Sequence, residues 1–373
     1  MNLPAHDALA SIIIPCWNQL EFTRLCLAAL VRHTRPPWEL IVVDNGSTDG
    51  TGSYLAGVQD VAPVPVTVVH NERNAGFPAA INQGLNAARG DYLVLLNNDA
   101  VVTDGWLSQL VALAEMDSDV TTKNTKDTKG ENGRGDGDGM RIGMVGPMSN
   151  YASPPQMVEN VPYSNMEEMQ AFARRWRDEH RGQWFSTGKL SGFCLLMKRA
   201  VYETIGGLDE QFGLGFFDDD DLAERARRAG FELAVAHDLF VHHDGSRTLT
   251  GAGIDAEKLL SENGRKFAAK WGTPAGNGRA VALVPWIGPE RRNARQDQPR
   301  MNTDLHGWER GTQARQESGE AAPHTGSPSS LSDPCSIRGS TLFDAPCHDV
   351  VDHDREGRRG QYFQMLIIRG RPV

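Results

Sequence analysis

Four consecutive aspartates, 218–221, stand between two phenylalanines and a leucine in the stretch FFDDDDL. Adjacent carboxylates repel one another, so an ordinary surface rarely needs four of them side by side. Such a run can be a solvated acidic turn, the start of a helix, a metal site or the general base of a reaction. The residues around the run separate these possibilities.

Helical spacing gives the four carboxylates different surroundings. A helix that begins at about residue 219 puts the acids at its N-terminus, where the macrodipole favours negative charge. Asp221 stands four residues before Arg225, which predicts an ordinary ion pair on the helix surface. Asp219 shares a face with Leu222 and Ala226, so we expect it to point toward the packed side. Asp220 is expected to be a solvated spectator.

Other acids and one histidine follow apolar runs directly. Asp99 comes after LLNN, where it could bind a hard divalent cation that carries a diphosphate, or form a simple turn. Asp44 closes the run ELIVVD and could accept hydrogen bonds from a base or ribose, or again form a turn. His243 could bind a metal or phosphate, or be structural. His242 should face the opposite side of the strand.

Several common catalytic sites have no matching motif. The chain has no GxGxxG after its first strand, no GxxxxGK[ST], no GxSxG and no HExxH. Its five cysteines are widely spaced without a CxxC pair, which predicts neither a disulfide framework nor a zinc site. A dehydrogenase, a P-loop NTPase and a serine hydrolase are therefore disfavoured, and the remaining candidate chemistry is acidic.

These residues need elements that bring them together. Residues 11–15, 39–44, 64–70 and 91–96 are aliphatic runs of strand length, with helical patterns between them. This alternation predicts βαβ units and a mostly parallel sheet, with ligands bound beyond the carboxyl ends of its strands. Polar motifs follow all four runs. Order is expected to return at 142–147, further strands are expected at 189–199 and 231–243, and a last helix ends near Trp271.

Composition limits the partners and the domain plan. The 373 residues carry a net charge of −10 without a basic stripe, so no nucleic acid is expected as a partner. No run is long and apolar enough for a membrane span or signal peptide, which predicts a cytoplasmic protein, with peripheral binding at the inner face of the membrane as an alternative. We expect a leader at 1–10, one domain at 11–274 with a low-complexity insertion at 117–139, and a disordered tail at 275–373.

Seven segments together resemble glycosyltransferase family 2, the inverting enzymes of the GT-A fold, and within it the rhamnosyltransferase-like members. The resemblance covers residues 11 to about 250, and its segments are IIIPCWNQ, VVDNGSTDGT, NAGFPAAINQG, LLNNDA, LSGFCLLMKR, GGLDEQFGLGFFDDDDLAERARRAGF and VHHDGSRT. It implies an α/β fold, a single Rossmann-like nucleotide-diphospho-sugar transferase domain.

The resemblance also implies roles for individual residues. Asp219 corresponds to the catalytic base, and Asp218 stands where the family usually has glutamate. Asp99 and His243 correspond to metal-side residues, with Asn97 in place of the first acid of the family's D-x-D element. The donor and its nucleotide would be bound by Pro15, Asp44, Asp49, Asn97, Asn98, Ser191 and Gly192.

The implied reaction is the transfer of a hexose or deoxyhexose from a UDP- or dTDP-type sugar to a saccharide or lipid-linked acceptor. Mg²⁺ or Mn²⁺ would neutralise the departing diphosphate. The pathway would be polysaccharide, glycan or glycolipid synthesis. A catalytically silent nucleotide-sugar-binding or scaffold protein is the alternative, and a nucleotidyltransferase is disfavoured because PCWNQLE is not a glycine-rich, basic phosphate loop.

Overall fold

The computed structural model describes residues 8–116, 141–245, 251 and 253–272. The chain divides into two compact units, and every described residue belongs to the first, which comprises 1–305 and 361–373. The expected insertion at 117–139 and tail at 275–373 lie outside the described residues, as does most of the leader.

The first four strands form the parallel half of the main sheet, in the order β3-β2-β1-β4. They agree with the four aliphatic runs of the sequence: β1 (Ala10–Cys16), β2 (Trp38–Asp44), β3 (Val66–His70) and β4 (Tyr92–Leu96). Every residue of β1, β2 and β4 is buried, as expected for strands covered on both faces. The chain order reverses on either side of β1, where α/β folds bind their ligands.

The other half of the sheet is mixed. β4 pairs antiparallel with β8 (Cys194–Lys198), and the order continues through β6 (Ile142–Met148), β9 (Glu232–Phe240) and β7 (Trp184–Thr187). Only β6 and β9 are parallel in this half. Four of the seven pairings are thus parallel, and the predicted α/β class with a mostly parallel sheet is confirmed.

Two expected strands are wrong in extent, and both errors concern the site. Within 189–199 only β8 is a strand, because the backbone N–H of Ser191 donates to the side chain of Gln156 instead of to a neighbouring strand. Within 231–243 the chain leaves the main sheet after β9. β10 (His242–His243) then pairs antiparallel with β5 (Ala100–Val101) in a separate two-stranded sheet.

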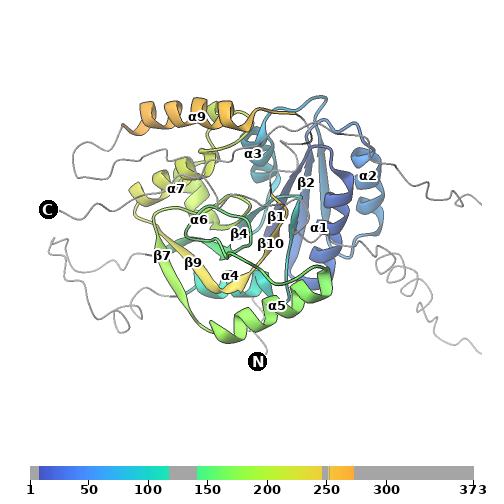
Figure 1. Cartoon of the computed structure of the whole chain (residues 1–373). Coiled ribbons are helices and arrows are strands. Elements are labelled where there is room, and N and C mark those ends of the chain that lie inside the picture. The colour runs from blue at the N-terminus through green and yellow to red at the C-terminus, as the bar shows by residue number, and fades with distance from the viewer. Residues whose placement is uncertain (1–7, 117–140, 246–250, 252, 273–373) are drawn as a thin grey trace, which may run out of the picture. The chain divides into compact units, whose positions relative to one another are not determined.

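The helices cover the sheet in two groups (Figure 1). Side-chain contacts connect α1 (Leu20–His33) to α2 (Thr51–Val61) and α4 (Trp106–Ala114), and α4 to α5 (Met166–Glu179). Similar contacts connect α3 (Phe77–Ala87) to α6 (Arg199–Ile205), and α6 to α7 (Asp218–Arg228). α9 (Ala256–Trp271) packs against η2 (Glu210–Phe212), a short 3-10 turn. No helix in the described ranges is long and apolar enough to cross a membrane.

Candidate active site

Asp99 and His243 form the first part of the site. Asp99 follows β4 and His243 lies in β10, and both are nearly buried, with 6% and 7% exposure. His243 Nε2 lies 3.1 Å from Asp99 Oδ1. Burial alone would raise the pKa of Asp99, but the charge and hydrogen bond of His243 outweigh it and hold the pKa below its usual value. The two side chains predicted to bind a metal are therefore brought into direct contact.

Contacts to Tyr151, Asn150 and Phe193 hold both the ring and the backbone of His243. Its Nδ1 donates to the backbone oxygen of Tyr151 at 2.7 Å, which leaves Nε2 to face Asp99. The amide of Asn150 exchanges two hydrogen bonds of 2.9 Å with the backbone of His243. Phe193 stacks on the ring with a centroid distance of 4.8 Å. His242 points the other way, to Tyr163, as strand alternation predicts.

Asn97 lies beside this pair. Its Nδ2 is 3.3 Å from His243 Nε2, while its buried Oδ1 has no hydrogen-bond partner. An amide oxygen, a carboxylate and an imidazole nitrogen suit Mg²⁺ or Mn²⁺, and a free buried oxygen is the kind of ligand that such an ion satisfies. No group of three or more His, Cys, Asp or Glu with metal-binding geometry occurs among the described residues. Asp99 and His243 supply only two ligands of these residue types, which is the number expected for a cation that is bound jointly with substrate phosphates.

Asp219 lies in the first turn of α7 and is half-buried. Its Oδ2 accepts a hydrogen bond of 2.9 Å from the backbone N–H of Gly192, and its Oδ1 accepts one from Asp220. A Cβ at position 192 would lie only 3.3 Å from the Cβ of Asp219. The next residue, Phe193, accepts a hydrogen bond from Asn97 N and stacks on His243. Two consecutive residues, Gly192 and Phe193, therefore connect the predicted base to the predicted metal residues.

The other aspartates of the run differ from expectation. Asp220 is not a solvated spectator, because its side chain is only 17% exposed and lies 3.7 Å from Lys189. Burial raises the pKa of Asp220 to about 6. Asp221 does pair with Arg225, at 2.8 Å, but it is fully buried instead of lying on the helix surface. The reason is that α9 covers this side of α7, a contact that helical periodicity within 218–228 does not encode.

Pro15 and Asp44 lie at the ends of neighbouring parallel strands. Pro15 pairs with Val43 of β2. On the other side, the pairing of β1 with β4 ends at Ile13–Leu95, so β4 needs no hydrogen bond from Pro15, which has no N–H to donate. Asp44 is 5% exposed; its Oδ1 accepts from Ser47 N at 3.0 Å, and its Oδ2 is 3.3 Å from His70 Nδ1. Both residues thus lie at the carboxyl ends of their strands, and their part in a nucleotide pocket stays a prediction.

Three of the predicted donor-side residues have contacts within the fold. Asp49 accepts hydrogen bonds from the backbone of Leu20 and from Thr51, and so joins the first turns of α1 and α2. Asn98 is buried and donates to Thr23 on α1, on the other side of the chain from His243. Ser191 donates its backbone N–H to Gln156. These contacts give the three residues structural roles beside the site.

Sequence reasoning missed several residues that shape the site. Asn45 is 4% exposed, and its amide makes four hydrogen bonds to the loop after β3, at Asn71, Asn74, Ala75 and Gly76. Asn150, Tyr151 and Phe193, which fix His243, were also not predicted. A repeated asparagine after each strand (Asn45, Asn71, Asn97) was the available signal.

A family model described as "Glycosyl transferase family 2" matches residues 11–206. The O-antigen biosynthesis protein RfbC of Myxococcus xanthus is 26% identical over 289 residues, which are 75% of this chain and 19% of the relative. Glycosyltransferase GlyG of Streptococcus pneumoniae serotype 4 is 30% identical over 119 residues, 31% of this chain and 38% of the relative. The chain thus spans well under half the length of these curated relatives.

Solved structures show the same kind of likeness at lower identity. The mannosyltransferase PcManGT of Pyrobaculum calidifontis, in complex with GDP-Man and Mn²⁺, is 20% identical with a TM-score of 0.43, covering 63% of this chain and 56% of its own. S. aureus TarS 1-349 in complex with UDP-GlcNAc is 15% identical with a TM-score of 0.45, covering 70% of this chain and 66% of its own.

Proposed function

This chain belongs to glycosyltransferase family 2, and from that membership we propose that it transfers a sugar, with inversion, from a nucleoside-diphosphate sugar to a hydroxyl acceptor. The observation that carries the proposal is the hydrogen bond from Gly192 N to Asp219 Oδ2, one residue from the Phe193 ring that stacks on His243. The segment Gly192–Phe193 thus contacts both the proposed carboxylate base and the histidine of the proposed diphosphate site.

In the proposed reaction Asp219 removes the proton of the acceptor hydroxyl. The acceptor oxygen forms a bond to the anomeric carbon while the bond from that carbon to the diphosphate oxygen breaks on the opposite face. The proton stays on Asp219 and the nucleoside diphosphate leaves. General base catalysis of this kind contributes roughly 10² to 10⁴ in rate. Two backbone N–H groups orient the carboxylate: Gly192 donates to Oδ2 and Asp220, in the first turn of α7, donates to Oδ1.

Asp99 and His243, with the free Oδ1 of Asn97, would bind the divalent cation. When bound, Mg²⁺ or Mn²⁺ supplies Lewis-acid stabilisation of the diphosphate charge. The charge of Asp99 raises the pKa of His243 despite its burial, so a cation would bind at Nε2 in place of the Nε2 proton, while Nδ1–H stays bonded to Tyr151.

The donor and the pathway are part of the proposal, which family membership supports only at the level of a nucleotide sugar and polysaccharide synthesis. We assign a UDP- or dTDP-type hexose or deoxyhexose as donor, the rhamnosyltransferase-like class included, and polysaccharide or glycan synthesis as the pathway. One relative is named for O-antigen biosynthesis, and two solved structures are complexes with GDP-Man and UDP-GlcNAc.

The test is a panel of UDP-, GDP- and dTDP-sugars, dTDP-rhamnose included, incubated with Mn²⁺ and scored by release of free nucleoside diphosphate, with and without acceptor extracts. We expect release from one nucleotide class. Asp60→Ala, an exposed residue on α2, is the matched control and should behave as wild type. Release from no donor, combined with retained nucleotide binding, would favour a silent nucleotide-sugar-binding protein.

A further inference from the structure

α9 begins fifty residues after the segment matched by the family model, at Ala256, yet it contacts the elements that carry Asp219. The contacts come from two places on α9. Asn263 in its middle faces the loop that precedes α7, and Lys270 and Trp271 at its end reach α7 itself.

The loop between η2 and α7 has an unusual backbone. Gly213 and Gly215 have positive φ angles of 60° and 123°, and Phe216 and Phe217 follow with φ of 66° and 67°. Two consecutive bulky residues in the left-handed region are unfavourable and persist only when their surroundings fix them. Because Asp219 comes two residues later, the direction of its side chain depends on this loop.

Asn263 supplies the first fixed point. It is fully buried, and its Nδ2 donates to the backbone oxygens of Phe212 and Gly215, at 2.7 Å each. One side chain thus joins the two ends of the turn. Phe267, one turn further along α9, packs against the ring of Phe217 with a centroid distance of 5.5 Å. α9 therefore holds both ends of this loop, in addition to the hydrogen bond from Phe77 N of α3 to Gly213 O.

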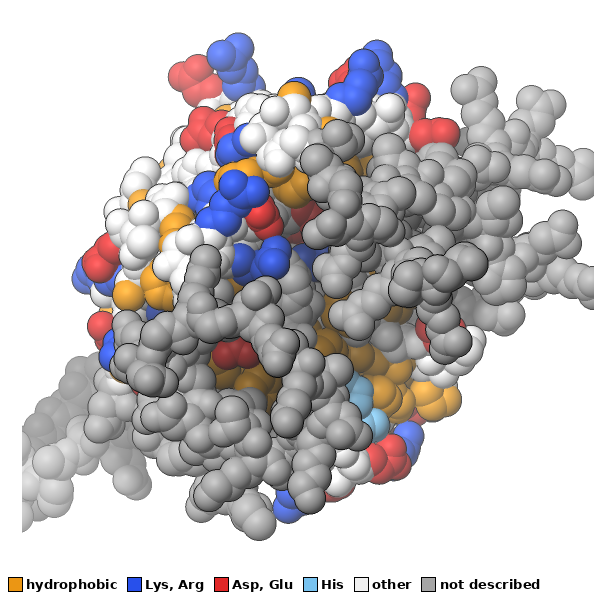
Figure 2. Space-filling view, turned by 90° about the vertical axis from the view of Figure 1, so that its left-hand side faces the viewer, with side chains coloured by type: hydrophobic (Ala, Val, Ile, Leu, Met, Phe, Trp, Pro, Cys, Tyr) orange, Lys and Arg blue, Asp and Glu red, His pale blue; other side chains and the backbone are white. Residues whose placement is uncertain are grey.

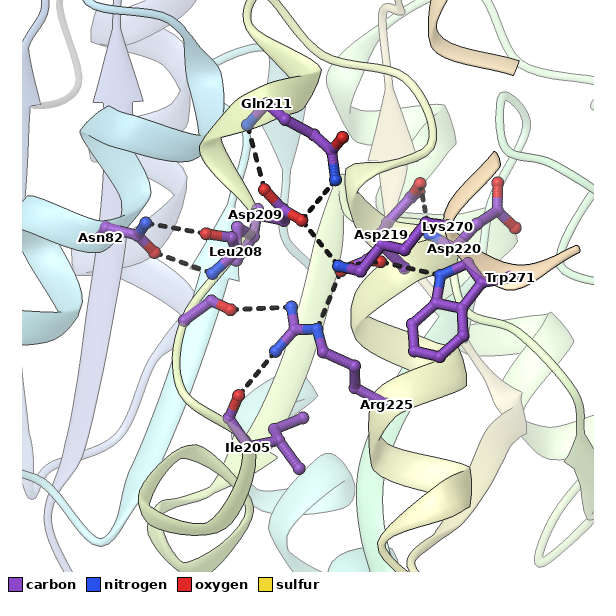
Figure 3. A network of polar contacts seen from close by, with 12 residues as sticks. Asn82, Ile205, Leu208, Asp209, Gln211, Asp219, Asp220, Arg225, Lys270 and Trp271 are labelled. Carbon is purple, nitrogen blue, oxygen red and sulfur yellow. Dashed lines mark hydrogen bonds and ion pairs between the residues drawn. The ribbon is translucent and has the colours of Figure 1, made fainter. Parts of the chain in front are cut away.

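Asp221 supplies the second fixed point, two residues after Asp219. Its buried carboxylate accepts from Trp271 Nε1 at 2.9 Å and contacts Lys270 Nζ at 2.6 Å, besides Arg225 on its own helix. Figure 3 shows Lys270 reaching between Asp209 and α7, with Asp219 on the same helix. Figure 2 shows the side of the molecule that lies on the left in Figure 1, where Lys and Arg side chains lie next to Asp and Glu side chains. A buried carboxylate needs such donors, and a shift of α7 relative to α9 would leave Asp221 with Arg225 alone.

We propose that α9 is a positioning element for the general base, with Asn263, Lys270 and Trp271 as positioning residues that direct Asp219 toward Gly192. The inference rests on the proposed function. None of the three residues needs to touch substrate. Their effect is to keep the loop 213–217 and the first turn of α7 in the one arrangement in which Asp219 accepts the Gly192 N–H bond.

The test uses the full chain with Asn263→Ala, Lys270→Met and Trp271→Phe. Trp271→Phe removes one N–H donor from a half-buried ring and is the variant that folds most safely. Lys270→Arg restores the charge. Arg265→Met is the matched control, because this exposed residue of α9 bonds only weakly, at 3.4 Å, to its own helix. Two quantities are measured: amide hydrogen exchange of 213–221, and the steady-state constants for release of nucleoside diphosphate from the active donor of the panel.

We expect exchange of 213–221 to become roughly 10-fold faster and kcat to fall roughly 10- to 100-fold, while the donor KM changes less than about two-fold, because only the placement of the base is altered. Lys270→Arg should regain most of the lost kcat. Unchanged exchange in Lys270→Met and Trp271→Phe would overturn the inference, as would faster exchange with wild-type kcat, or an equal loss in Arg265→Met. Failure of the wild type to release nucleotide from any donor would instead refute the proposed function, and exchange would still show whether α9 fixes the loop.

Discussion

Asp218 and Asp219 are neighbours in the chain but have different surroundings. Asp219 is half-buried and accepts the N–H of Gly192, whereas Asp218 is 4% exposed. Burial, and then the charge of Asp219, raise the pKa of Asp218 well above its ordinary value. Asp218 is thus suited to carry a proton itself, and under the proposed function Asp219 is the neighbour that takes one from the acceptor hydroxyl.

Asp219→Asn should abolish nucleotide release from the active donor, with kcat lower by roughly 10² to 10⁴, because the amide cannot take the proton. Binding of UDP with Mn²⁺, measured by calorimetry, should stay within a few-fold of wild type. The same experiment on Glu224→Gln, a partly exposed acid of the same helix that pairs with Arg227 and Arg228, provides the control. A variant that retained wild-type turnover would refute the assignment of the base.

Asp218→Asn should stabilise the protein at high pH. The folded state binds the Asp218 proton more tightly than the unfolded chain, so the free energy of unfolding falls as pH rises above the ordinary value of 3.8 toward the raised pKa. The variant has no carboxyl group at 218 and therefore does not lose this stability as the pH rises. Each unit by which folding raises the pKa corresponds to about 1.4 kcal/mol in the free energy of unfolding. Urea unfolding at pH 5 and pH 8 should therefore show a gain over wild type that is larger at pH 8. An equal effect at both pH values would contradict it.

At the element scale, the strand ends are joined through side-chain amides. Asn45 follows β2 and bonds to the loop after β3, while Asn97 follows β4 and lies beside His243 of β10. The strands were predictable because aliphatic runs bounded by polar turns have few other uses in an α/β protein. The hydrogen bonds between these loops were not predictable, because they depend on which strand ends are neighbours in the sheet.

Asn45→Ala should loosen this edge of the sheet. Four hydrogen bonds are lost, among them those to the half-buried Asn74 and the buried Gly76, which predicts a loss of roughly 1–3 kcal/mol in the free energy of unfolding. Affinity for UDP should fall as well, since Asp44 begins the same loop. Asp60→Ala, on the exposed side of α2, is the control for urea unfolding and calorimetry. Unaltered stability would show that water replaces the lost bonds.

At the scale of the whole molecule, the site is assembled from segments far apart in the sequence. Asp99, Asn150 and His243 come from the ends of β4, β6 and β10, and Asp219 comes from α7. Gly192 and Phe193 join the two groups because β8 runs antiparallel to β4, which places its first residue opposite the last residue of β4. The antiparallel insertion of β8 into a parallel sheet is therefore what makes the site possible.

Asp99→Ala should weaken nucleotide binding in the presence of Mn²⁺ by roughly 10-fold or more, in line with the loss of a metal ligand. Calorimetric titration of UDP into the wild type should show the same loss after a chelator is added, and the variant should be insensitive to the chelator. Asp60→Ala provides the control. Titrations that do not change with chelator would refute a role for the cation in binding.

The sequence by itself determined the alternation of strands and helices, the parallel half of the sheet and the polar positions Asp44, Asp99 and Asp219, because each depends on local periodicity and on the chemistry of a strand end. It also predicted that His242 and His243 face opposite sides. Only the tertiary structure decided that residues 189–193 are a turn beside the base and that His243 leaves the main sheet to meet Asp99. The burial of Asp221 by α9 was decided there too. These facts depend on contacts between residues separated by up to about 150 positions, and burial by a distant helix leaves no trace in the periodicity of the helix it covers.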